Sequence, residues 1–175
     1  MPSSPPTAAT PSQPGDAFEG ASADWVKEII RQGELRLQAQ LQSALAADAR
    51  AGVLASIQAA VVAALVVFGG SDEVRGAEEA AAYSAAALTF LGAVLAGIAA
   101  RPIGFDFPGL APLDWAEAVQ TKEPEDSANR AYAQYLDDYI KANDDRMKIN
   151  GWFTRAALVA MVLAPAAAVI ALAVA

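Results

Sequence analysis

The stretch AGVLASIQAAVVAALVVFGGS, residues 51–71, decides the fold. It lies between Arg50 and Asp72 and holds no charged residue. At a rise of about 1.5 Å per residue, a helix of this length spans roughly the 30 Å hydrocarbon core of a bilayer. The sequence therefore predicts a transmembrane helix over residues 51–71.

Two further blocks have the same character, AAAYSAAALTFLGAVLAGIAA over residues 80–100 and AALVAMVLAPAAAVIALAVA over residues 156–175. The linker of residues 72–79 is short and carries Gly76, so we expect the first two helices to form an antiparallel hairpin. Three blocks of spanning length argue against a cleaved leader or a single signal anchor. The predicted fold is an all-α membrane protein with three transmembrane helices.

The amino-acid composition narrows the range of possible functions. The chain has no Cys and no His, which removes thiol nucleophiles, disulfides, zinc sites of the usual kind and the commonest general base. We find no catalytic or metal-binding motif and expect neither an enzyme nor a cofactor. The net charge of -8 argues against binding to duplex nucleic acid.

The remaining segments flank the spans. Residues 1–22 are rich in Pro and lack Lys and Arg, which predicts a disordered tail. Residues 23–50 place apolar side chains on one face of an amphipathic helix that runs directly into the first span: Val26, Ile30, Leu37, Leu41 and Ala44. Residues 101–155 form a loop rich in aromatics, expected to pack against the helices or to lie on the headgroups, and then a second helix. That helix has one buried stripe and solvated Asp residues, Asp144 among them.

The distribution of Lys and Arg predicts the orientation. Four precede the first span, Arg75 alone lies between the first and second, and seven lie between the second and third. By the positive-inside rule, residues 1–50 and 101–155 are cytoplasmic, and the linker of residues 72–79 is outside.

Each span has a cation at its cytoplasmic end: Arg50 for the first, Arg101 for the second, and Lys148 with Arg155 for the third. Arg50, Arg101 and Lys148 are the candidate ligand residues. One interpretation is that they determine topology and contact lipid headgroups. The other is an anion site in which the cations hold a phosphate while Tyr135 or Tyr139 stacks on a base.

Within the first span, Gln58 is the most polar residue, and Ala55, Ala59 and Ala63 form a ridge of small residues on an adjoining face. The ridge favours close helix packing. We expect Gln58 to hydrogen-bond between helices or to line a water path in an oligomer. The heptad-like spacing of residues 23–50 offers a way to gather copies, so a homo-oligomer is expected.

With these segments placed, the chain resembles the transmembrane effectors of Pycsar antiphage systems. The residues that carry the resemblance are ADARA at 47–51, ARP at 100–102 and the polar helix through Met147 and Lys148 that leads to the last span. In the first motif this chain has Arg50 where the family pattern leads us to expect Lys.

The resemblance implies a multi-pass protein of the bacterial inner membrane. A cyclic pyrimidine mononucleotide (cUMP or cCMP), made by an adjacent cyclase upon phage infection, would activate it, and it would then impair the membrane in abortive infection. Two other functions stay open. A constitutive lytic protein of the holin type would kill without a ligand, and a membrane scaffold subunit would not kill at all.

Overall fold

The computed structural model describes residues 15–102 and 104–174 of the chain. Within these ranges all regular elements are helices, in the order η1 (Asp16–Phe18), α1 (Ala23–Gly69), α2 (Ala77–Ala99), η2 (Pro112–Trp115), α3 (Ala116–Thr121) and α4 (Glu125–Val174). Helices α1, α2 and α4 are each long and apolar enough to cross a membrane. The predicted fold class is thereby confirmed, and the prediction for residues 1–14 lies outside the described residues.

The two long helices are continuous, as the sequence predicts. Helix α1 contains both the amphipathic segment and the first apolar block, and α4 contains both the polar helix and the third block. Local signals place the ends of α1: Ser22 accepts a hydrogen bond from the amide of Trp25 at 3.4 Å, and Gly70 donates to the carbonyl of Val66 at 3.0 Å. Helix α1 therefore ends at Gly69, slightly before the predicted end of the span.

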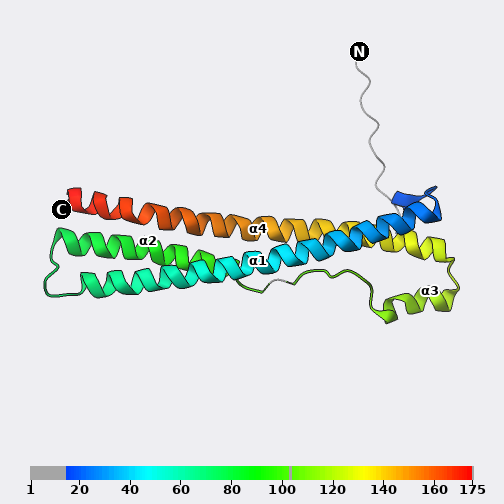
Figure 1. Cartoon of the computed structure of the whole chain (residues 1–175), viewed down its shortest axis with the longest axis horizontal. Helices are drawn as coiled ribbons and strands as arrows, with labels where there is room; N and C mark the ends of the chain where they lie inside the picture. Colours follow the sequence, from blue (N-terminus) through cyan, green and yellow to red (C-terminus); the bar gives the residue numbers. More distant parts are fainter. Residues whose placement is uncertain (1–14, 103, 175) are drawn as a thin grey trace, which may run out of the picture. The chain divides into compact units, whose positions relative to one another are not determined.

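The described residues, drawn with their helix labels in Figure 1, divide into two compact units, and each is described by itself. The first, here called the polar unit, comprises residues up to 41 together with 105–144. The second, here called the apolar unit, comprises residues 42–104 and 145 onward.

In the polar unit, the first part of α1 packs along the first part of α4. The buried cluster consists of Leu37 from α1 and Tyr132, Leu136 and Ile140 from α4. At Gly33 a Cβ would lie 3.1 Å from Cδ1 of Leu136, so the missing side chain lets the two helices approach closely. Of the apolar stripe predicted to gather copies, Leu37 is buried in this cluster against α4 of the same chain, and Ile30 packs against the cluster.

The loop of residues 105–115 lies against this helix pair, one of the two predicted arrangements. Asn143 clamps one residue of the loop from both sides: its Oδ1 accepts from the amide of Asp106 at 3.1 Å, and its Nδ2 donates to the carbonyl of Asp106 at 3.0 Å. The amide of Gly109 donates to the hydroxyl of Tyr132 at 2.9 Å, and Trp115 meets the Tyr132 ring edge to face. The loop is therefore held as an extended strap.

In the apolar unit, α2 packs with the second parts of α1 and α4. Small residues fill the inside, since Ala51, Ala96, Ala99 and Ala157 are almost fully buried. Large apolar side chains such as Val67, Phe90 and Val162 are more than half exposed on the outside. Small residues inside and large apolar residues outside are the arrangement expected of helices that pack in lipid.

Candidate functional site

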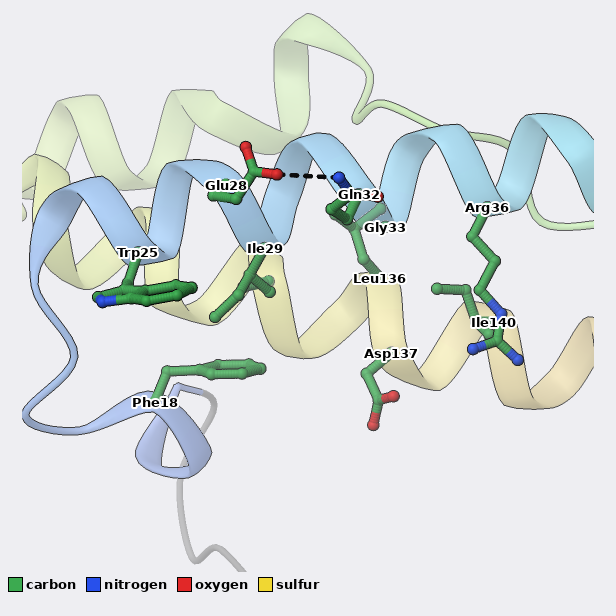
Figure 2. A pocket seen from close by; sticks show the side chains of 11 residues that line it. Phe18, Trp25, Glu28, Ile29, Gln32, Gly33, Arg36, Leu136, Asp137 and Ile140 are labelled. Carbon is green, nitrogen blue, oxygen red and sulfur yellow. Dashed lines mark hydrogen bonds between the residues drawn. The ribbon is translucent and has the colours of Figure 1, made fainter.

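An open groove of about 640 Å³ lies in the polar unit between the N-terminal turn, α1 and α4. Its walls combine apolar and charged side chains: Phe18, Trp25, Glu28, Ile29, Gln32, Gly33, Arg36, Ala133, Leu136, Asp137 and Ile140. Figure 2 shows Trp25 of α1 and Phe18 on opposite sides of the open space, with Arg36 farther along α1. The groove thus has an aromatic end and an end that carries a guanidinium group.

Phe18 takes its place because the N-terminal turn is tied to α4. The amide of Gly15 donates to Oε1 of Gln134 at 2.6 Å, and Nη2 of Arg130 donates to the carbonyl of Ala21 at 3.2 Å. Gly15 has φ +94°, and a Cβ there would lie 3.1 Å from the amide nitrogen of Ala131, so this position requires glycine. Of residues 15–22, which the sequence analysis assigned to the end of the tail, Phe18 lines the groove.

The carboxylates of the groove already have cationic partners. Glu28 bonds Arg31, and this bond, together with that from Gln32, lowers the pKa of Glu28 to about 2. Asp137 pairs with Lys141, one turn away on α4. Neither carboxylate is therefore an uncompensated negative charge that would repel an incoming anion.

Arg36 is the cation of the groove that can exchange its partner. Its Nη2 lies 3.2 Å from Oδ2 of Asp144, and 62% of the Arg36 side chain is exposed. Asp144 also accepts from Nε2 of Gln40 at 2.6 Å and would keep that bond if Arg36 turned away. An exposed ion pair of this kind contributes about 0–1 kcal/mol, so replacing it costs little. Asp144, predicted to be a solvated residue, is thus part of a polar network.

The predicted stacking residues lie elsewhere on α4. The rings of Tyr135 and Tyr139 stack on each other with centroids 6.5 Å apart, so each presents one face to the other ring. Neither lines the groove. Both belong to the polar unit, whereas the three predicted cations belong to the apolar unit.

Arg50, Arg101 and Lys148 lie at one end of the apolar unit. Asn150 donates to the carbonyl of Ala99 at 3.2 Å, which sets the start of the third span beside the end of α2. Gln58 of α1 donates to the carbonyl of Ala157 in α4. Ala51 lies seven residues before Gln58, and Asn150 lies seven residues before Ala157, so Ala51 and Asn150 lie at the same level of the two helices. All three cations are exposed, and Lys148 pairs with Asp145 at 2.8 Å.

The polar contact inside the apolar unit joins three helices. Gln58 of α1 is 0% exposed, and its Nε2 donates to the carbonyl of Ala157 in α4 at 2.9 Å. Gly92 of α2 lies against the same amide. Of the predicted ridge, Ala55 is half-buried, and Ala59 and Ala63 are exposed along a shallow apolar groove.

These features define a class, a helical protein with three candidate membrane spans and a grooved polar unit. Comparison with protein-family models, curated proteins and solved structures finds no match to this chain. Function must therefore be argued from its own residues.

Sequence reasoning missed the residues of the groove. Phe18 fell within the predicted tail, and neither Trp25 nor Arg36 belongs to the apolar face predicted for residues 23–50. The available signal was Phe18 itself, because an isolated aromatic in a stretch rich in Pro and Gly is a reason to expect a local contact.

Proposed function

We propose that this chain is a membrane effector of a nucleotide-signalled antiphage defence system. A cyclic pyrimidine mononucleotide, cUMP or cCMP, made by an adjacent cyclase upon infection, binds the polar unit on the cytoplasmic side. Binding switches the protein to a state that impairs the inner membrane and ends the infection with the cell.

The observation that carries this proposal is the groove, because its two ends match the two halves of the ligand. Phe18 and Trp25 offer aromatic faces across an open space (Figure 2), and base stacking on aromatic side chains contributes about 1–3 kcal/mol per base. Arg36 offers a guanidinium group for the cyclic phosphate. The volume of about 640 Å³ falls within the range usual for small-molecule sites.

The charges support binding of a singly negative ligand. Glu28 and Asp137 are paired with Arg31 and Lys141, and the Arg36–Asp144 pair is exposed and exchangeable. The phosphate takes the place of Asp144 on Arg36, and Asp144 stays bonded to Gln40. Binding thus breaks a contact between α1 and α4, which gives the ligand a direct effect on the helix pair.

Binding is tested with the full chain in lipid nanodiscs by calorimetric titration of cUMP and cCMP. Loss of a charge-assisted contact to phosphate costs roughly 1.5–3 kcal/mol, so we expect Arg36→Ala to weaken binding about 10- to 100-fold. Lys27→Ala is the matched control, since Lys27 is an exposed cation of α1 that does not line the groove. Unchanged affinity in Arg36→Ala with loss in Arg50→Ala or Arg101→Ala would move the phosphate to the predicted cations and overturn the groove assignment.

Function is tested by membrane potential in cells, with a voltage-sensitive dye, with and without a co-expressed pyrimidine cyclase. We expect depolarisation only with the cyclase, lost in Arg36→Ala and kept in Lys27→Ala at equal expression. Depolarisation without the cyclase would instead indicate a constitutive holin-type protein. Silence in both conditions would indicate a scaffold, and either result overturns the proposal.

A further inference from the structure

A groove of about 320 Å³, here called the end groove, lies in the apolar unit where α1 ends, α2 begins and α4 ends. Its floor consists of buried alanines of α2, namely Ala81, Ala82 and Ala85. Phe68 of α1 and Leu172 of α4 line its sides, and about half of each of these side chains is exposed. The end groove is therefore open to whatever surrounds the helices.

The end groove extends from the ends of the spans toward their middle. Glu78 lines it just outside the uncharged block of residues 80–100, and Ala85 lines it seven residues farther along α2. Seven residues of helix correspond to about 10 Å, so the groove begins near the headgroups of a bilayer and continues among its acyl chains. In a membrane, lipid is therefore the molecule that meets this surface.

Glu78 is the charged residue of the end groove, and its carboxylate has no partner among residues 15–102 and 104–174. Its side chain is exposed and makes no hydrogen bond or ion pair with these residues. All the other lining residues are apolar. A carboxylate beside an apolar surface favours an occupant that has a cationic N–H donor next to a hydrocarbon chain.

The charges around Glu78 argue against two other occupants. Residues 72–79 carry four carboxylates, and Arg75 is the one cation of this segment. An anionic lipid would be repelled at this level of the membrane. A second copy in the same orientation would bring its own four carboxylates to the same level, which disfavours an interface between copies here. The charges thus favour a lipid that carries a cation and has no net negative charge.

We propose that the end groove binds one molecule of phosphatidylethanolamine. One acyl chain lies over the alanines of α2 between Phe68 and Leu172, and the primary ammonium group of the lipid donates to the Glu78 carboxylate. A phosphatidylcholine headgroup has no N–H to donate, and a phosphatidylglycerol headgroup has no cation. The site belongs to the apolar unit and does not depend on the function proposed for the polar unit.

Binding is measured by native mass spectrometry of the full chain in detergent, titrated with phosphatidylethanolamine or with phosphatidylcholine that has the same acyl chains. We expect wild type to bind phosphatidylethanolamine about three- to tenfold more tightly, the effect of one exposed charge-assisted contact. Glu78→Gln should remove this preference. Glu79→Gln is the matched control and should keep it, since Glu79 lies in the same first turn of α2 but does not line the groove.

Both variants remove one negative charge from the same helical turn, so effects of net charge or of the helix terminus are equal in the two. Equal affinity of wild type for the two lipids would overturn the proposal. A preference that persists in Glu78→Gln, or that is lost equally in Glu79→Gln, would overturn it as well.

Filling the end groove tests the place of the acyl chain without a change of charge. Ala168 and Ala167 of α4 are both half-buried, but only Ala168 lines the groove. We expect Ala168→Leu to weaken binding of both lipids about tenfold and Ala167→Leu to leave it unchanged. Circular dichroism checks the fold of each variant, and the comparison of Glu78→Gln with Glu79→Gln decides the proposal even if Ala168→Leu does not fold.

Two results with Ala168→Leu would contradict the proposal. Unchanged lipid binding in this variant would show that the acyl chain lies elsewhere. A dimer that forms without lipid in wild type and is lost in Ala168→Leu would show that a second copy covers the groove.

Discussion

Tyr132 shows how one side chain holds three segments of the polar unit. Its hydroxyl donates to Oε1 of Glu34 in α1 at 2.8 Å and accepts from the amide of Gly109 in the strap at 2.9 Å. The residue is only 4% exposed. Burial, and then the hydrogen bond to the Glu34 carboxylate, raise the pKa of Tyr132 to about 12.

The raised pKa predicts a loss of stability at high pH. Tyr132 in the unfolded chain releases its proton near pH 10, whereas in the folded chain it keeps the proton to about pH 12. The unfolded state therefore binds fewer protons in this window, and stability falls as the pH rises through it. We expect Tyr132→Phe to lower the free energy of unfolding by about 1–3 kcal/mol at pH 8 and to weaken the decline between pH 10 and 12.

The measurement is thermal unfolding of the full chain in nanodiscs at several pH values, followed by circular dichroism. Tyr135→Phe is the control, because Tyr135 is partly exposed and its ring stacks on that of Tyr139. An equal decline above pH 10 in wild type and Tyr132→Phe would show that other groups control the alkaline limit.

The roles of single residues were the hardest features to predict from the sequence. The apolar face of residues 23–50 was predicted correctly at Val26, Leu37 and Ala44, which follow the helical period and are buried. The roles of Gly15 and Gly92 could not be predicted, since each depends on an atom more than thirty residues away in the chain. Short-range patterns contain no information about such contacts.

At the scale of elements, the strap is held mainly by side chains of α4. The amide group of Asn143 makes two hydrogen bonds to the backbone of Asp106, and both partners are main-chain atoms. The bonds therefore fix the path of the strap whatever its side chains are. Loss of both should raise the population of the open strap roughly 5- to 150-fold, for a cost of about 1–3 kcal/mol.

We accordingly expect Asn143→Ala to speed proteolytic cleavage within residues 105–111 by about this factor in the full chain. Asn129→Ala, also on α4, is the control. Cleavage is followed by mass spectrometry of the fragments over time. Equal rates in Asn143→Ala and wild type would mean that Leu110 and Trp115 hold the strap without the clamp.

Elements were predicted well where a regular pattern of apolar residues extends over a long segment, and poorly where no such pattern exists. Helices α1, α2 and α4 follow from uncharged blocks and from amphipathic stripes that continue into them. Residues 101–115, with Pro102, Pro108 and Pro112, have no period that could predict a path. Their anchors, such as Asn143, come from a helix that begins later in the chain.

At the scale of the whole molecule, the prediction concerns which segments lie on which side of the membrane. By the positive-inside rule, the surplus of Lys and Arg before the first span and between the second and third predicts that both segments of the polar unit lie in the cytoplasm. Since the chain contains no Cys, single cysteines can report this directly. We expect Ser71→Cys, between α1 and α2, to react with a membrane-impermeant maleimide on intact cells.

Ser127→Cys, in the first turn of α4, should react only after the cells are made permeable. Labelling of Ser127→Cys on intact cells, with Ser71→Cys protected, would show that the chain has the opposite orientation. The groove would then face the outside, where a cytoplasmic nucleotide could not reach it. The structure supports three candidate spans, and the side on which each end lies rests on the distribution of charge.

The bond between Gly15 and Gln134 has a consequence for biosynthesis. The two residues are 119 positions apart, and the segment between them contains the first two candidate spans. A ribosome must therefore synthesise both spans before the second wall of the groove exists. Nascent chains, and fragments that end before α4, lack the α4 wall of the groove, so under the proposed function they could not bind the nucleotide.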